Sequence, residues 1–144
     1  MELSEIASVS GKGGLYKVLK PTKSGVILES LDEVKTKQVA TVTQKLSLLN
    51  EISIYTTSKE GTVSLELVLR KIHHDFGSDP GVDAESDGGE LKAFLKSVLP
   101  EYDEDRVYVS DIKKLVKWYG IILRFAPEIL VETLKEKESG DETK

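Results

Sequence analysis

Carboxylates and imidazoles are the side chains of this sequence that could do chemistry, and the carboxylates include one tight cluster. The acidic cluster consists of Glu101, Asp103, Glu104 and Asp105. A calcium-binding loop needs oxygen ligands at its first, third and fifth positions, a glycine at the sixth and a glutamate at the twelfth. Asp103 and Asp105 match the first two, but Val107 occupies the next ligand position and no glycine follows it. We therefore expect no metal site here; instead, Asp103 or Asp105 should accept hydrogen bonds from Arg106 or from backbone N–H groups of the loop.

His73 and His74 are the two histidines, and they follow each other directly. Neighbouring residues on a helix point about 100° apart, so two adjacent imidazoles cannot easily bind one metal ion. The end of a helix suits them better, because a cationic side chain there complements the negative end of the helix dipole. The sequence contains no cysteine, which excludes disulfides, thiolate zinc sites and cysteine nucleophiles. We predict no catalytic residue, no metal and no cofactor, and an enzyme that uses the acidic cluster is the least favoured interpretation.

The predicted helix that starts near residue 110 carries the strongest pattern in the chain. Ser110 can cap its first N–H groups, and Asp111 complements the positive end of the helix. Apolar residues then recur with helical spacing and form one stripe: Ile112, Leu115, Val116, Tyr119, Ile122 and Leu123. We expect the rest of the chain to pack against this stripe.

Opposite the stripe, the same helix carries cationic side chains. What we call the basic helix face consists of Lys113, Lys114, Lys117, Trp118, Ile121 and Arg124, with the only tryptophan of the chain at its border. A lysine and arginine surface edged by tryptophan is typical of a docking site for RNA, DNA or an acidic protein. The alternative is an ordinary solvated surface, on which the lysines also cover apolar atoms and Trp118 packs against a neighbouring helix.

This surface leads to our functional prediction. We expect a non-enzymatic binding or adaptor module that uses the basic helix face to bind a partner protein; the identity of the partner and the oligomeric state stay open. Binding to RNA or DNA is the alternative. Because the face has only four basic residues, phosphate contacts would be few and the binding would be sensitive to salt.

The charge of the chain is unevenly distributed along the sequence. The 144 residues carry a net charge of −5, and residues 61–105 hold four Lys and Arg against eleven Asp and Glu. General attraction to nucleic acid through net charge is therefore not expected. No apolar run approaches the roughly 20 residues that span a bilayer, and the first residues lack the apolar core of a secretory leader. We expect a cytoplasmic protein that does not contact a membrane.

In the first part of the chain, apolar and polar residues alternate, as they do in strands. After a short helix or turn within residues 1–13, we predict strands at 15–20, 26–31, 37–42 and 52–55, with a helical turn at 46–49. Hairpins between such short strands indicate a small, curled sheet. We predict an SH3-like β-barrel, because closing the sheet removes its exposed edges.

The second part of the chain is predicted to be helical. A helix over 63–76, capped by Ser64 and ended by Gly77, completes a first domain of residues 1–76. Residues 77–89 are rich in glycine, serine and aspartate and predict a flexible acidic linker. A capping box of Asp87 and Glu90 opens an all-helical module over 90–134, and residues 135–144 are expected to be a disordered tail. The fold class is therefore α+β.

Several of these segments together resemble a known family. They are Gly11, Gly14–Lys17, Glu29–Asp32, Ile52–Tyr55 and Leu99–Tyr119. The chain resembles, from about Met1 to Leu123, a family of small conserved Bacteroidetes proteins known as domains of unknown function. The resemblance implies a cytoplasmic bacterial protein built in two parts, and it supplies no catalytic or binding residues.

Overall fold

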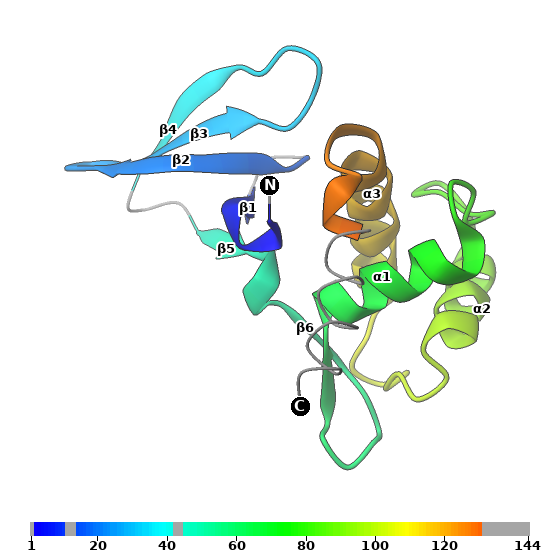
Figure 1. The fold of residues 1–144 in the computed structure, drawn as a ribbon. Helices are drawn as coiled ribbons and strands as arrows, with labels where there is room; N and C mark the ends of the chain where they lie inside the picture. The colour runs from blue at the N-terminus through cyan, green and yellow to red at the C-terminus, as the bar shows by residue number, and fades with distance from the viewer. Residues whose placement is uncertain (1, 11–13, 42–44, 131–144) are drawn as a thin grey trace, which may run out of the picture.

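An antiparallel sheet, a β-hairpin and three helices follow one another along the chain (Figure 1). The computed structural model describes residues 2–10, 14–41 and 45–130. The elements are η1 (Leu3–Glu5), β1 (Ile6–Val9), β2 (Tyr16–Thr22), β3 (Gly25–Ser30), β4 (Lys37–Thr41), β5 (Leu46–Leu48), η2 (Leu49–Glu51), β6 (Ser53–Tyr55), β7 (Thr62–Ser64), α1 (Leu65–Phe76), α2 (Gly88–Val98) and α3 (Val109–Phe125). The predicted α+β class is confirmed. Residues 11–13 of the predicted N-terminal segment, residues 131–134 of the predicted helical module and the tail at 135–144 lie outside the described residues.

The five-stranded sheet has the order β4-β3-β2-β1-β5 with antiparallel neighbours throughout. Alternation along the strands separates its two faces, because successive side chains point to opposite sides. One face buries a small cluster made of Val9, Tyr16, Leu28 and Ala40. Ser8 and Ser47 stand directly opposite each other in the pairing of β1 with β5, on the other face. The strands predicted at 15–20, 26–31 and 37–42 are thereby confirmed as β2, β3 and β4.

The predicted SH3-like barrel is wrong, because the sheet stays open. β4 and β5 are its edge strands, and in the described part of the chain they do not pair with each other. The strand predicted at 52–55 is β6, which pairs with β7 in a separate hairpin. At the other edge of β6, the carbonyl oxygen of Tyr55 accepts a hydrogen bond from the N–H of Asp103 at 2.9 Å. β6 therefore has partners on both sides, and it is not available to close the sheet.

Three segments form strands that the sequence pattern did not predict. The N-terminal segment begins with the short helical turn η1, as predicted, but Ile6–Val9 then forms β1 in the interior of the sheet. Residues 46–48, predicted as a helical turn, are β5, and the turn follows one residue later as η2. Thr62–Ser64, assigned in part to the first helix, is β7. These strands are only three or four residues long, so their own sequences show too few alternations to reveal them.

A large apolar core joins the end of the sheet to the helices. It contains Leu3, Ile6, Leu15, Leu31 and Leu49 from the N-terminal part, and Leu65, Leu69, Leu91, Leu95, Ile112, Leu115, Tyr119 and Ile122 from the helices. The predicted stripe of α3 is buried at five of its six positions, and Leu123 is half-buried. The expectation that the chain packs against this stripe is confirmed.

Both ends of α1 and the start of α2 have the cap residues that the sequence predicted. The Ser64 hydroxyl accepts a hydrogen bond from the N–H of Leu67 at 3.2 Å, and Gly77 ends α1 with a positive φ of 62°. At the start of α2, an Asp87 carboxylate oxygen accepts a hydrogen bond from the N–H of Glu90 at 2.8 Å. This bond favours the charged carboxylate and lowers the pKa of Asp87.

Ser110 is not the N-cap of α3, because the capping position lies two residues earlier than predicted. Tyr108 holds the capping position, and its N–H donates to an Asp111 carboxylate oxygen at 2.9 Å. Asp111 closes this first turn and also complements the positive end of the helix, as predicted. Its carboxylate is thus engaged by the backbone of its own helix.

Residues 77–89 connect α1 to α2 through short hydrogen-bonded turns. The carboxylates of Asp79 and Asp83 accept from the N–H groups of Gly81 and Glu85 at 3.0 and 2.8 Å. The Tyr119 hydroxyl donates to the carbonyl oxygen of Gly77, which ties α3 to the end of α1. Burial raises the pKa of that hydroxyl. The division of the chain at this segment stays a prediction.

Gly25 and Gly120 provide a matched test of the sheet. A Cβ atom on Gly25 would lie 1.8 Å from the carbonyl oxygen of Ala40, whereas one on Gly120 has no neighbour within 4 Å. Gly25→Ala should separate β3 from β4 and destabilise the protein by about 1–3 kcal/mol. Gly120→Ala should be neutral or stabilising by up to about 1 kcal/mol, because alanine favours the helix. Urea unfolding of both variants measures this, and equal effects would contradict the observed pairing of β3 with β4.

Limited proteolysis tests the predicted linker. Residues 77–89 bury little apolar surface, so a broad-specificity protease should cut there before it cuts elsewhere among the described residues. Mass spectrometry of the first fragments gives the position of the cut. A first cut between residues 26 and 55 would show that the boundary is misplaced.

Candidate binding site

A groove of about 330 Å³ lies where the sheet, the β6–β7 hairpin and the first half of α3 meet. Its polar rim consists of Ser8, Ser47, Ser53, Tyr55, Arg106, Asp111, Lys114 and Trp118. Its apolar lining consists of Ile52, Ile54, Leu65, Leu95, Val107, Ile112 and Leu115. We call this cavity the groove. Several of its apolar residues, among them Leu65 and Leu95, also belong to the large core, so the floor of the groove is rigidly supported.

The strands place hydroxyl groups on one side of the groove. Ser8 and Ser47 are directly opposite residues of β1 and β5, so they reach the same side of the sheet. Ser53 and Tyr55 are two residues apart on β6, and they share one face of the hairpin because alternate residues of a strand point to the same side. Tyr55 is exposed for 47% of its surface, which is unusual for a large aromatic residue. These walls offer hydroxyl donors and acceptors beside an exposed ring.

Two cations face these hydroxyls from the other side of the groove. The guanidinium of Arg106 lies over the ring of Tyr55, 5.4 Å from its centre, and its Nε lies 3.8 Å from an Asp103 carboxylate oxygen. Lys114 is exposed and makes no ion pair within the described part of the chain. The one carboxylate on the rim, that of Asp111, already accepts a backbone hydrogen bond. Of the side chains that line the groove, two are cationic and one is a carboxylate, and Asp103 pairs with Arg106 just outside the lining.

The structure divides the predicted basic helix face. Lys114 and Trp118 line the groove, whereas Lys113 and Lys117 are exposed on α3 outside its lining. Ile121 is half-buried and packs against the large core. Arg124 forms an ion pair with Glu33 in the loop between β3 and β4, and its guanidinium lies 5.0 Å from the centre of the Phe125 ring. Arg124 thus fastens the sheet to α3.

Trp118 packs against the core and borders the groove, and its role in docking stays a prediction. Its side chain is half-buried. The residues that sequence reasoning missed are Ser8, Ser47, Ser53, Tyr55 and Arg106. They come from four separate places along the chain, since only Ser53 and Tyr55 share a strand, so no local spacing could have grouped them all. Only the polar residues at alternate positions of β6 gave any signal.

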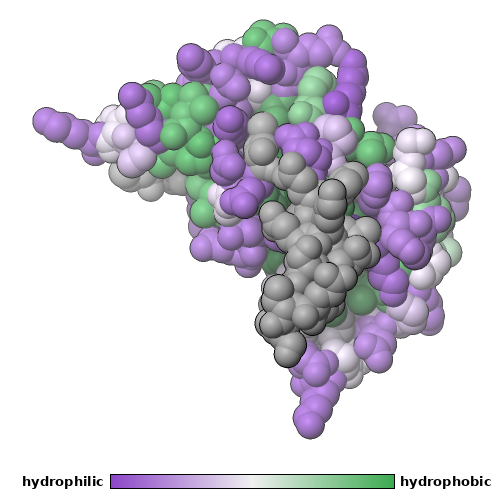
Figure 2. Space-filling view, viewed as in Figure 1, coloured by the Kyte–Doolittle hydropathy of each residue, from purple (hydrophilic) through white to green (hydrophobic). Residues whose placement is uncertain are grey.

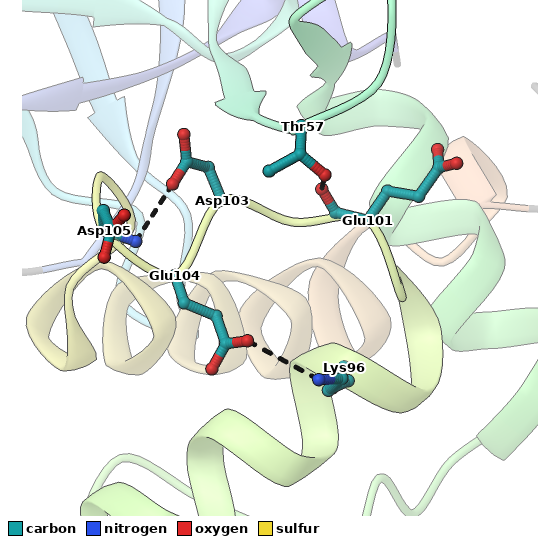
Figure 3. Close-up of polar contacts among 6 residues, drawn as sticks. All are labelled: Thr57, Lys96, Glu101, Asp103, Glu104 and Asp105. Atoms are coloured by element: carbon teal, nitrogen blue, oxygen red, sulfur yellow. Dashed lines mark hydrogen bonds and ion pairs between the residues drawn. The ribbon is translucent and has the colours of Figure 1, made fainter.

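The acidic cluster is a structural loop in which the side chains point to different partners (Figure 3). Asp103 accepts a hydrogen bond from the N–H of Asp105 at 3.0 Å and also pairs with Arg106, as predicted. Glu104 lies 3.5 Å from the ammonium of Lys96 on α2. The backbone carbonyl of Glu101 accepts from the Thr57 hydroxyl at 3.2 Å. The cluster thereby connects the hairpin, α2 and the start of α3.

The two histidines lie in the last turn of α1, where the helix dipole favours a cation. The ring of His74 pairs with Asp75 at 3.1 Å. Within residues 2–10, 14–41 and 45–130, no group of three or more histidine, aspartate or glutamate side chains is arranged to hold a metal ion. In the same described ranges, no helix is both long and apolar enough to pass through a membrane.

Comparison with known proteins divides the chain into two matched regions. Residues 3–49 match a domain of unknown function, DUF5606, and residues 52–122 match another, DUF6852. The solution NMR structure of a Bacteroides vulgatus protein is similar with 35% identity and a TM-score of 0.67, covering 87% of this chain and 88% of that one. No curated protein matches the chain. The groove takes Ser8 and Ser47 from the first region and the rest of its lining from the second.

The absence of a metal site is tested by thermal unfolding with added ions. Zn²⁺, Ca²⁺ and Mg²⁺ should each leave the melting temperature unchanged, because an ion stabilises a protein only by binding the folded state better than the unfolded state. Differential scanning fluorimetry measures the shift. A reproducible rise with one ion, lost in a variant that combines Asp103→Asn with Asp105→Asn, would show that the acidic cluster binds metal.

Proposed function

This chain belongs to the same family as the Bacteroides vulgatus protein and combines a DUF5606 region with a DUF6852 region, and we propose that it is a non-enzymatic binding module for a partner protein. The observation that carries the proposal is the groove, which both regions build together. The side chains that line the groove support this proposal. We place the module in the cytoplasm, in line with its lack of cysteine.

The lining of the groove has the composition of a protein-binding site. Tyr55, Arg106 and Trp118 are of the three types that most often dominate the binding energy of protein interfaces. They surround an apolar floor, and a few polar groups beside such a floor fix the orientation of what binds there. Catalysis has less support, because the carboxylates of Asp103 and Glu104 are engaged in ion pairs and a backbone hydrogen bond.

The exposed lysines of α3 extend this site beyond the groove. Lys113 and Lys117 lie on the same helix as Lys114, and both are exposed to solvent. Charges at the rim of an interface mainly steer the encounter and raise the association rate. We therefore propose that the partner presents acidic side chains to α3 and inserts others into the groove.

RNA or DNA is the second candidate, and the ring of Tyr55 under Arg106 is the observation in its favour. Exposed aromatic rings next to cations can stack nucleic-acid bases. The acidic cluster directly precedes Arg106, however, and would repel a phosphate backbone at this rim. A protein partner is therefore the better supported proposal.

Charge reversal on α3 tests the proposed function. A variant with Lys113→Glu, Lys114→Glu and Lys117→Glu should keep its fold, since exposed charges usually change stability by less than about 0.5 kcal/mol each. It should lose partners that the parent captures by crosslinking after nuclease treatment, because their association depends on these charges. Mass spectrometry of the captured proteins gives the comparison.

A matched control reverses the same number of charges elsewhere. Lys20, Lys71 and Lys92 are exposed on β2, α1 and α2, so changing all three to glutamate alters the net charge equally. This control should keep the partners of the parent. Equal loss in both variants would indicate an effect of net charge alone, and full retention in the α3 variant would contradict the proposed site.

A further inference from the structure

The groove has the size and charge to recognise a specific pair of side chains. We infer that it binds a short segment of the partner protein in which an apolar side chain is followed directly by a carboxylate. This inference rests on the proposed function and names the ligand class of the same site. It follows from the volume, the floor and the charges of the groove, taken in turn.

The volume of the groove limits what can enter it. At about 330 Å³ it is at the lower end of the range of ligand pockets, which is roughly 300–1,000 Å³. A whole α-helix, about 10–12 Å in diameter, is too thick to sit inside such a cavity. Two neighbouring side chains of a short segment fit it. The floor, which includes Leu65, Ile112 and Leu115, requires that the deepest of them is apolar.

Arg106 and Lys114 supply the charge that a carboxylate needs. Arg106 lies over the Tyr55 ring and near an Asp103 carboxylate, and most of its side chain is exposed, so its N–H groups can reach a ligand. Lys114 makes no ion pair with any described residue, and its ammonium is available at the same rim. Hydrogen bonds between such cations and a carboxylate are about twice as strong as neutral ones.

The surroundings favour a single negative charge over many. Asp103, Glu104 and Asp105 stand next to Arg106 in the chain, so a ligand that extends its negative charge along this rim meets like charges. A single carboxylate near Arg106 and Lys114 meets less of this repulsion than a chain of phosphates does. The hydroxyls of Ser8 and Ser47 on the facing strands can donate to and accept from the backbone amides of the segment. A peptide satisfies these groups, whereas a phosphate backbone offers acceptors alone.

Two capped dipeptides test the inference directly. The probes are acetyl-Leu-Asp-amide and acetyl-Leu-Asn-amide, which differ only in the charge of the second side chain. The readout is the indole N–H signal of Trp118 in a nitrogen-labelled sample of the full chain, because the chain has one tryptophan and that residue lines the groove. The aspartate probe should shift this signal saturably and bind at least about tenfold more tightly than the asparagine probe.

Two adjacent lysines give a matched pair of variants. Lys114→Gln and Lys113→Gln each remove one charge from neighbouring positions of α3, but only Lys114 lines the groove. Lys114→Gln should reduce the preference for the aspartate probe to about twofold or less, and Lys113→Gln should leave it unchanged. Both residues are exposed, so both variants should melt like the parent.

Three results would overturn the inference. They are the absence of a saturable indole shift with the aspartate probe, equal affinities for the two probes, and equal effects of the two variants. A fourth result would also overturn it, namely an oligouridylate that shifts the same indole signal and binds more tightly than the aspartate probe. That result would favour the nucleic-acid alternative. If the dipeptides fail while the charge-reversed α3 variant still loses its protein partner, the proposed function stands and only the groove is wrong as the recognition site. If that variant keeps every partner, the proposed function itself fails.

Discussion

Burial of one side of α3 is the constraint on which the rest of the structure depends. Ile112, Leu115, Tyr119 and Ile122 are between 0 and 3% exposed, and they share one core with residues of the sheet end and of both other helices. Removing this apolar surface from water is the largest stabilising contribution that the helical part offers. Two polar contacts then fix the orientation of the helix: Tyr119 bonds to the end of α1, and Arg124 pairs with the loop that carries Glu33.

The groove is a consequence of how three elements meet at that core. The sheet is open, so its β1–β5 side presents Ser8 and Ser47 as a free wall, and β6 leaves the sheet to pair with β7. The first half of α3 lines the remaining side of the groove. A closed barrel would have used β6 as a wall strand and would have left no such space. The error in the predicted topology therefore concerns the same strand that creates the site.

Charge and apolar surface are distributed over different parts of the molecule. Large hydrophobic residues such as Leu19 and Val39 are partly exposed on β2 and β4, and in Figure 2 apolar residues gather over this part of the sheet among hydrophilic ones. The acidic residues are concentrated between the hairpin, α2 and the start of α3, where they link elements. Asp32 has a similar local role: bonds from the Lys35 N–H and the Ser30 hydroxyl lower its pKa and hold the loop after β3.

Local patterns in the sequence determined the helices, their caps and most of the sheet. The spacing of Leu65, Leu69 and Ile72, the Ser64 and Asp87 caps and the stripe of α3 are all readable from single segments, because a helix is stabilised by bonds and contacts within about four residues. The alternation in β2, β3 and β4 is local for the same reason. The family resemblance was also recognisable from the sequence, since it depends on motifs that lie within short stretches.

Only the tertiary structure decided which strands pair and which polar residues meet. The partner of a strand is chosen by packing between distant segments, so the sequence could not show that β6 would pair with β7 or that residues 6–9 would enter the sheet. The division of the basic helix face has the same origin. Lys113 and Lys114 are indistinguishable as neighbours in a sequence, and the position of the sheet beside α3 makes one of them a wall of the groove. Contacts between Arg106 and Tyr55 likewise exist because the loop after α2 folds back onto the hairpin, a long-range event with no local signal.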